Sequence, residues 1–264
     1  IGRHVVTALW DMGACVYALD LCTEGGDPRA QWMQADVFDP SFAPVELFDE
    51  MPEVCLHLAW RNGFDHNAPT HMGDLSGHYL FLHKMIDAGV GRVVVMGSMH
   101  EVGYWEGAIT EDTPCKPLSA YGVAKDALRR ALEIESGRKG FALQWLRGFY
   151  IYGDDAQSQS IFGKLLRAAQ AGQNTFPFTT GKNKYDFTPV AELAHMIAAA
   201  TMQDEVLGII NCCSGKPVSL AEQIEGFIRD NHLDIQLEYG AFPDRPYDSP
   251  GVWGDASKIQ RILG

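Results

Sequence analysis

Residues 92–96, Arg-Val-Val-Val-Met, followed by Gly97 and Ser98, form the most strand-like stretch of the chain. Its run of β-branched residues favours a strand, and its lack of polar alternation is typical of a strand buried on both faces. Similar apolar runs occur on either side of it along the chain, at residues 15–19, 54–59, 141–146 and 208–211. The run at 15–19 ends in Asp20. We therefore expect a largely buried, parallel sheet.

Segments with helical periodicity separate these runs, and they cover about residues 2–12, 72–88, 118–137, 158–172 and 190–202. Alternating strands and helices predict an α/β fold in which a Rossmann-like, doubly wound parallel sheet carries helices on both faces. After about residue 153 the pattern loosens. We expect residues 1–153 with parts of 185–213 to form a dinucleotide-binding domain. Residues 154–184 and 214–264 are then a small C-terminal substrate-binding lobe.

The start of the chain coincides with the start of a predicted helix, and no apolar strand precedes it. Without an opening strand, a sheet of this type has an unpaired edge in its middle. We therefore expect the natural chain to begin earlier, by roughly ten residues or a little more. The C-terminus, which follows a short helical segment, is a second place where residues are expected to be missing.

Composition restricts the kinds of partner. The chain has 264 residues, 46% of them hydrophobic, and a formal net charge of -13. This charge disfavours nucleic acid and anionic membranes as partners, and the sequence has no apolar run long enough for a transmembrane helix. The six cysteines are scattered, without a CxxC pair. We therefore expect a cytoplasmic protein without structural disulfides or a metal site.

Tyr121 and Lys125 are spaced four residues apart in a segment with strong helical periodicity. Residues at this spacing share one helix face, so the ammonium is expected to lie near the phenol and to lower its pKa from about 10. Such a phenol is suited to general acid/base catalysis. Ser98 lies at the carboxyl end of a predicted strand, where open α/β sheets bind ligands. Each of these residues, taken alone, also occurs as an ordinary surface or turn residue.

Several further motifs share the order and spacing of one family. They are Ser98 with Gly103, Glu111 with Pro114, Pro117, Tyr121 and Lys125, His57-Leu58-Ala59-Trp60, Asp36-Val37, residues 146–153, Tyr185-Asp186-Phe187 with Val190, and residues 244–248. Together they resemble the extended short-chain dehydrogenases, which include nucleotide-sugar epimerases, dehydratases and 4-keto reductases. The resemblance covers almost the whole chain. Only Gly2 resembles the glycine-rich opening of that family.

The resemblance implies a set of roles for residues of this sequence. The catalytic residues are Ser98, Tyr121 and Lys125. The cofactor-binding residues are Gly2, Asp20, Asp36, Val37, Leu58, Ala59, Trp60, Tyr121, Lys125 and Phe149. The substrate-binding residues are Ser98, Met99, His100, Tyr150 and Arg245. Lys164, Arg167 and Lys184 are further candidate cations for a diphosphate; they are equally compatible with solvated surface positions.

The expected cofactor is NAD, because an acid at the end of the second strand of such a fold bonds the ribose diol and repels a 2'-phosphate. Asp20 is that acid. Arg3 is close enough in sequence to keep NADP as a less favoured cofactor. The expected substrate is a nucleotide sugar that reacts at C4.

Some residues depart from the family pattern. Dehydratases have an Asp-Glu pair where this chain has Met99 and His100, which disfavours 4,6-dehydration; Glu101 is a weaker candidate for the acid. Tyr150 replaces a common Asn, as in some 4-keto reductases. Epimerisation and 4-keto reduction stay open, since both use the same residues. The sequence is also compatible with an enzyme for a non-sugar alcohol and with a dinucleotide sensor that has no activity. The resemblance further implies a homodimer formed by helices 72–88 and 118–137.

Overall fold

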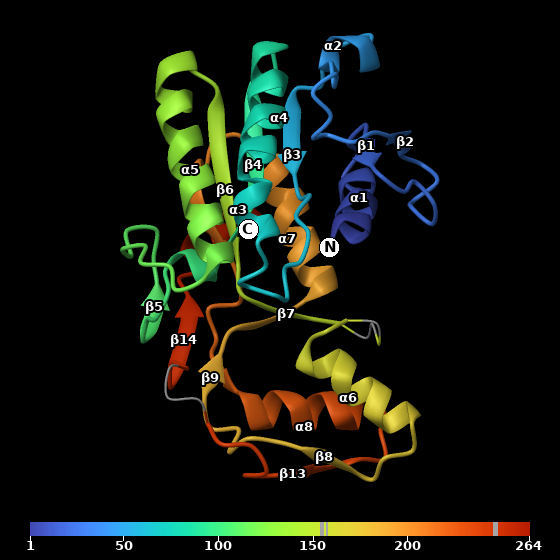
Figure 1. The fold of residues 1–264 in the computed structure, drawn as a ribbon, viewed down its shortest axis with the longest axis vertical. Helices are drawn as coiled ribbons and strands as arrows, with labels where there is room; N and C mark the ends of the chain where they lie inside the picture. The colour runs from blue at the N-terminus through green and yellow to red at the C-terminus, as the bar shows by residue number, and fades with distance from the viewer. Residues whose placement is uncertain (154–155, 157, 245–247) are drawn as a thin grey trace.

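The centre of the molecule is a sheet of four parallel strands in the order β11-β6-β4-β3 (Figure 1). The computed structural model describes residues 1–153, 156, 158–244 and 248–264. The strands of this sheet are β3 (Val54–His57), β4 (Arg92–Ser98), β6 (Ala142–Gly148) and β11 (Gly208–Cys212). They coincide with the apolar runs in the sequence, so the predicted parallel sheet is confirmed.

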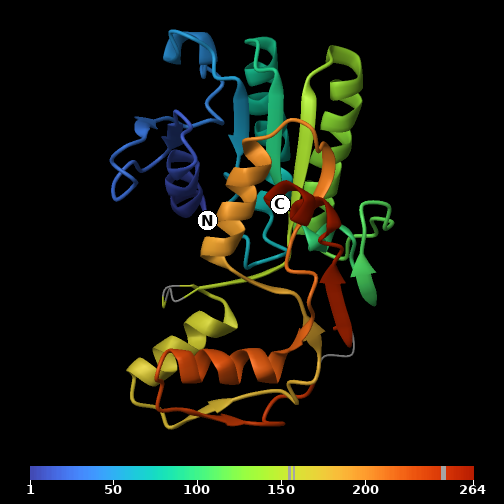
Figure 2. The ribbon, with the colours of Figure 1, turned by 180° about the vertical axis from the view of Figure 1, so that it is seen from behind.

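Helices cover both faces of this sheet (Figures 1 and 2). The helices α4 (Leu75–Asp87) and α5 (Ala120–Lys139) lie on one face, and α7 (Val190–Thr201) lies on the other. Helix α1 (Gly2–Asp11) packs against α7. This arrangement confirms the doubly wound α/β architecture.

Successive residues of β4 enter two different cores, because side chains alternate between the faces of a strand. Val93 and Val95 pack with α4 and α5, in a cluster that includes Leu82. Val94 and Met96 belong to the other cluster, which contains most of α7. The central strand thus contributes to both layers of the core, which explains why its sequence shows no polar alternation.

The second parallel unit contains β1 (Tyr17–Asp20) and β2 (Gln31–Gln34) and is separate from the four-stranded sheet. In the described part of the chain, no strand is hydrogen-bonded between β1 and β3. The sequence predicted β1 but not β2. Glutamines at both ends of β2 and its polar surroundings conceal the strand from a prediction based on hydrophobic pattern.

The smaller part of the molecule lies below the carboxyl ends of the central strands in Figure 1. Its two longer helices are α6 (Ile161–Gln170) and α8 (Leu220–Asp230). Short strands complete it and join it to the large part: β5 (Gly107–Ile109), β7 (Tyr150–Tyr152), β8 (Thr175–Pro177), β9 (Lys184–Tyr185), β10 (Phe187–Pro189), β12 (Val218–Ser219), β13 (Gln236–Glu238) and β14 (Gly251–Gly254). The sheet β12-β9-β14-β5 contains strands from both halves of the chain.

The remaining elements are short. They are α2 (Pro44–Leu47), α3 (Thr70–Gly73), the 3-10 turn η1 (Met99–Glu101) and α9 (Ser257–Leu263). In the described ranges, no helix combines the length and the apolar character needed to cross a bilayer. All six cysteines are free thiols.

Candidate active site

The structure brings Ser98, Tyr121 and Lys125 together at the carboxyl end of β4. Ser98 is the last residue of β4, and its side chain lies close enough to the phenol of Tyr121, at the start of α5, to act on the pKa of that phenol. Lys125 follows one turn later and is 3% exposed. Its Nζ donates to the Met96 carbonyl at 2.6 Å. The predicted group of three side chains is therefore assembled at the expected edge of the sheet.

Local sequence fixes the position of helix α5. The Ser119 hydroxyl caps its first turn by accepting from the amide of Gly122 at 3.2 Å. Gly122 itself allows a close approach, since a Cβ at this position would lie 2.3 Å from the His100 carbonyl oxygen. The Tyr121 amide donates to the His66 carbonyl at 2.9 Å. These contacts hold the phenol against the turn that follows Ser98.

The electrostatics of the pair differ from the prediction. Burial raises the pKa of Tyr121 to about 12, although the hydrogen bond from Ser98 opposes the shift. Burial also lowers the pKa of Lys125 to about 7. The expectation that Lys125 lowers the pKa of Tyr121 is wrong for this structure, because its Nζ turns to the Met96 carbonyl and lies 5.9 Å from the centre of the phenol ring.

Histidines surround the phenol ring. His66 stacks on Tyr121 with ring centres 5.5 Å apart, and His71 and His100 approach it at 5.2 and 5.9 Å. His66 and His100 also contact each other at 4.2 Å. Burial and the neighbouring His66 lower the pKa of His100 to about 4, so this ring is neutral at pH 7. The sequence predicted His100 but missed His66, in the loop after Trp60, and His71, in the short helix α3; their only signal is two histidines in this segment.

Trp60 is held firmly beside this group. Its ring stacks on His78 at 4.1 Å, and its Nε1 donates to Nδ1 of His71 at 3.1 Å. Lys125 Nζ lies 3.8 Å above the indole, at a distance typical of a cation–π contact. Behind it, His57 and His78 share a hydrogen bond of 2.9 Å. Trp60 thus lies directly beside Lys125. The sequence predicted that both residues contact the cofactor.

The predicted nucleotide-binding residues lie at the other side of the sheet. Gly2 opens α1, whose first turn has no side-chain cap and no acidic residue. Asp20 is exposed at the end of β1 and accepts from the Cys22 amide at 3.2 Å. Asp36 is exposed as well, next to the half-buried Val37. Leu58 and Ala59 follow β3 directly and reach the surface in part.

These groups fit a dinucleotide. The open amides of the first turn of α1 suit a pyrophosphate, and the Asp20 carboxylate is an acceptor for a ribose diol. The buried Lys125 ammonium adds a donor next to Tyr121. The donor and acceptor types therefore match the cofactor that the sequence predicted.

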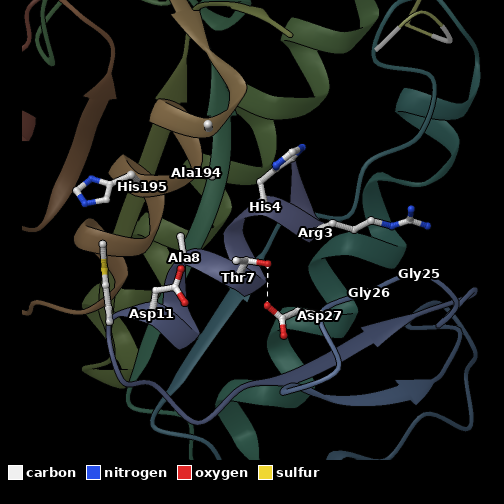
Figure 3. A pocket seen from close by; sticks show the side chains of 12 residues that line it. Arg3, His4, Thr7, Ala8, Asp11, Gly25, Gly26, Asp27, Ala194 and His195 are labelled. Carbon is white, nitrogen blue, oxygen red and sulfur yellow. Dashed lines mark hydrogen bonds between the residues drawn. The ribbon is translucent and has the colours of Figure 1, made fainter. Parts of the chain in front are cut away.

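Figure 3 shows a surface groove along α1 that is separate from the catalytic group. It lies between α1, residues 25–27 and the start of α7, with a volume of about 690 Å³. Arg3 and His195 are among its lining residues, whereas Ser98, Tyr121 and Lys125 are not. The Arg3 guanidinium donates to the Glu24 carbonyl at 3.1 Å. The Arg3 side chain is therefore hydrogen-bonded to the loop that follows β1.

The predicted substrate-binding residues are placed less uniformly. The side chain of Met99 is buried in the hydrophobic core, as is that of Phe149, which was predicted to bind the cofactor. The ring of Tyr150 lies against that of Tyr185, with ring centres 4.3 Å apart and the planes tilted by 31°, and burial raises the pKa of Tyr150. Arg245, the predicted phosphate contact, lies outside the described residues.

The other cations that the sequence predicted for a diphosphate also differ from one another in their surroundings. Arg167 donates to the Ser158 carbonyl at 2.8 Å and so holds its own loop, while Lys164 and Lys184 are exposed. Glu101, which the sequence indicated as a weak candidate acid, points into the protein and contacts Trp145 and Arg147. Its burial is incompatible with direct protonation of a substrate.

Comparisons with known proteins identify the family of this chain. The family profile described as "NAD dependent epimerase/dehydratase family" matches residues 1–213. The dTDP-6-deoxy-L-talose 4-dehydrogenase (NAD(+)) of Aggregatibacter actinomycetemcomitans is 40% identical over 260 residues, which cover 96% of this chain and 95% of that protein. The UDP-glucose 4-epimerase of Lactobacillus helveticus is 25% identical over 292 residues and covers 100% of this chain and 88% of its own.

The fold also matches solved structures. A UDP-glucose 4-epimerase from Stenotrophomonas maltophila, determined with bound NAD and formylated UDP-arabinopyranose, aligns with a TM-score of 0.86 at 19% identity. The alignment covers 100% of this chain and 89% of that one. The Rossmann-like fold predicted from the sequence is confirmed. By its motifs, its fold and the match over residues 1–213, this chain belongs to the NAD-dependent epimerase/dehydratase family.

Proposed function

We propose that this protein is an NAD-dependent 4-keto reductase, equivalently a 4-dehydrogenase, of a dTDP-activated 6-deoxysugar. The observation that carries the proposal is the 40% identity to a dTDP-6-deoxy-L-talose 4-dehydrogenase, which extends over nearly the full length of both chains. The grouping of Ser98, Tyr121 and Lys125 also supports it, because these side chains can transfer the proton that reduction of a ketone requires. The substrate named for that relative is thus the first to test here.

The state of the phenol favours reduction over oxidation at neutral pH. With a pKa of about 12, Tyr121 is protonated at pH 7. A protonated phenol is the form that gives a proton to the C4 oxygen when a ketone is reduced. In the oxidising direction the same oxygen must first lose its proton. The rates of reduction and of oxidation therefore depend on pH in opposite ways through this one group.

Each residue of the site has a role in this reaction. Tyr121 transfers the proton to or from the C4 oxygen, and Ser98 orients that oxygen by its hydroxyl. Neutral His66 and His100 cover the phenol without adding charge. When bound, NAD supplies or accepts the hydride. Gly2 at the start of α1, Asp20 and Lys125 are the residues that would hold it.

A panel of nucleotide sugars and their 4-keto forms, assayed with NADH and NADPH, tests the proposal. The expected result is consumption of one NADH per 4-keto sugar reduced, with dTDP-6-deoxy substrates preferred. Interconversion of sugars without net consumption of NADH would instead show an epimerase, which the similarity to UDP-glucose 4-epimerase keeps as the second candidate. Failure of every nucleotide diphosphate to raise the melting temperature would favour a non-sugar substrate.

We also propose that the chain forms a homodimer through α4 and α5. Both helices expose large apolar side chains, among them Leu80 at 53% and Ile134 at 67%. The helices are joined by a hydrogen bond between His83 and Glu135 and by an ion pair between Lys139 and Asp87. Such an exposed apolar surface is typical of an interface. Light scattering should give twice the chain mass; a monomer at micromolar concentration would contradict the dimer.

Two further proposals concern organisation and location. We propose that residues 154–184 and 214–264 form the substrate-binding lobe, supported by the position of α6 and α8 below the sheet edge that ends in Ser98 (Figure 1). We propose a cytoplasmic location, supported by six cysteines that are all free thiols.

A further inference from the structure

Glu101 is a carboxylate enclosed completely by the protein, directly behind the catalytic serine. Its exposed fraction is 0%. Its Oε1 accepts from the Ser98 amide at 2.7 Å and from the Trp145 indole at 2.9 Å. Its Oε2 lies 3.4 Å from Nε of Arg147 and 3.8 Å from Nε of Arg129.

Among the described residues, each group that hydrogen-bonds this carboxylate is a donor. A protonated carboxyl would need an acceptor for its own proton, and the contacts of Glu101 offer none. Burial raises the pKa of Glu101, and the guanidinium of Arg147 opposes this shift. Arg147 is itself fully buried. The geometry is therefore that of an ionised carboxylate whose removal would leave a buried guanidinium without its partner.

The strand is built to make room for this group. A Cβ at Gly97 would lie 2.1 Å from Nε1 of Trp145 and 2.7 Å from Oε1 of Glu101. A larger residue at position 97 would therefore push both groups apart. The tight fit fixes the carboxylate relative to the residue that follows Gly97, which is the catalytic Ser98.

Glu101 and Ser98 are linked by reciprocal hydrogen bonds across the 3-10 turn η1. The Glu101 side chain accepts from the Ser98 amide, while the Ser98 hydroxyl accepts from the His100 amide at 3.3 Å. These reciprocal bonds form a capping box. They set the direction of the serine hydroxyl, which acts on the pKa of the neighbouring Tyr121 phenol.

The charge of Glu101 acts on the catalytic pair as well. Its negative charge raises the pKa of Tyr121 and the pKa of Lys125. The other charged or titratable groups packed around it are His100 on η1, Cys115, Asp126 and Arg129 on or near α5, and Arg147 on β6. Among the described groups, Glu101 is the acid whose charge affects the pKa of both catalytic residues.

We propose that Glu101 is a positioning residue of the reaction: it fixes Ser98 through the backbone amide and supplies a permanent negative charge close to Tyr121 and Lys125. The part of this inference that concerns the reaction rests on the proposed function. A substrate is not required for its electrostatic part, which can be tested on the protein alone.

The decisive variant is Glu101→Gln, which keeps the shape of the side chain and an acceptor for the Ser98 amide. Without the negative charge, Tyr121 ionises more easily. The rise of oxidative turnover with pH should therefore move to lower pH by about half a unit or more, and kcat should fall with little change in KM. Glu106→Gln, an exposed neighbour in the same segment, is the matched control and should keep the wild-type profile.

Trp145→Phe separates charge from packing. It removes one donor to Glu101 but leaves the carboxylate, so the protein should be less stable while its pH profile stays in place. An unshifted profile in Glu101→Gln, or equal shifts in Glu101→Gln and Trp145→Phe, would overturn the proposal. If Glu101→Gln does not fold, Glu101→Asp keeps the charge and withdraws it from Ser98. A fall in kcat without a shift supports the proposal, and an unchanged kcat refutes it.

A measurement without substrate distinguishes this proposal from the proposed function. The pH dependence of the melting temperature reports the ionisation of Lys125. In Glu101→Gln the lysine should deprotonate at lower pH than in Glu106→Gln. If the wild type reduces no nucleotide sugar but this shift appears, the proposed function fails and the electrostatic role of Glu101 stands. The absence of the shift refutes that role whatever the substrate.

Discussion

The two ends of the expected cofactor path are built differently. Around the end of β4, the side chains proposed to be catalytic are enclosed: Ser98 is 7% exposed and Lys125 is 3% exposed. Around the end of β1, Asp20 and Arg3 are exposed and bond only to the nearby loop. Burial therefore controls ionisation in the first region, which we call the catalytic corner. In the second, the nucleotide end, recognition depends on single exposed charges, and we expect substitutions to have smaller effects there.

The largest effect is expected from Tyr121→Phe in the catalytic corner. Loss of the phenolic hydroxyl removes the group that transfers the proton, so turnover should fall by about 10²–10⁴-fold. The ring is largely enclosed by His66 and His71, and phenylalanine keeps these contacts. Steady-state kinetics with the substrate found in the panel, together with NADH binding by fluorescence, measures the effect.

The binding measurement serves as the internal control for that variant. Cofactor affinity and melting temperature should stay close to those of the wild type, because the phenyl ring is retained. Turnover within a factor of about ten of the wild type would remove Tyr121 from the mechanism.

The next effect concerns the stability of the folded state and its pH dependence. Lys125 has a folded-state pKa of about 7, below the value of 10.5 for a free lysine. Between these values the unfolded chain holds a proton that the folded chain lacks, so stability rises with pH through this window, by about 1.4 kcal/mol per unit. Below pH 7 both states are protonated, and the full cost of burying the charge is present.

Lys125→Met removes this contribution while keeping the length of the side chain. The variant should therefore gain most over the wild type at or below pH 7, and its advantage should shrink or reverse as the pH approaches 10. Denaturant unfolding of both proteins across this range measures the difference. A gap that does not depend on pH would show that Lys125 keeps its ordinary pKa in the folded protein.

The sequence alone predicted that Ser98, Tyr121 and Lys125 lie together, but it did not predict their electrostatics. The apolar run at 92–96 and the spacing of Tyr121 and Lys125 place the side chains, because strand ends and helix faces are periodic. Their pKa values depend on burial by residues distant in sequence. The Met96 carbonyl attracts Lys125, and Glu101 lies inside instead of at the surface. No local pattern contains that information.

At the nucleotide end, the sequence predicted only part of the secondary structure. The sequence predicted β1 and Asp20 from a short apolar run, but it missed β2, whose pairing with β1 depends on backbone hydrogen bonds. His66 and His71 were missed for a similar reason. His66 lies in a loop and His71 in the single turn of α3, both too short for a periodic pattern, and the contact of the His66 carbonyl with the start of α5 brings this segment to Tyr121. Residues placed by tertiary contacts are thus the ones that sequence patterns leave out.

The smallest effect is expected from Asp20→Ser at the nucleotide end. The carboxylate is an acceptor for a ribose diol and would repel a 2'-phosphate, so its removal should weaken NADH and favour NADPH. Because Asp20 is exposed and solvent screens its charge, the ratio of kcat/KM for NADPH over NADH should rise only about tenfold. Asp11→Ser, which removes an exposed acid at the far end of α1, is the control and should leave the ratio unchanged. An unchanged ratio in Asp20→Ser would mean that this carboxylate takes no part in cofactor choice. The difference in burial between the catalytic corner and the nucleotide end would then explain how the catalytic corner ionises, but it would not explain how the cofactor is recognised.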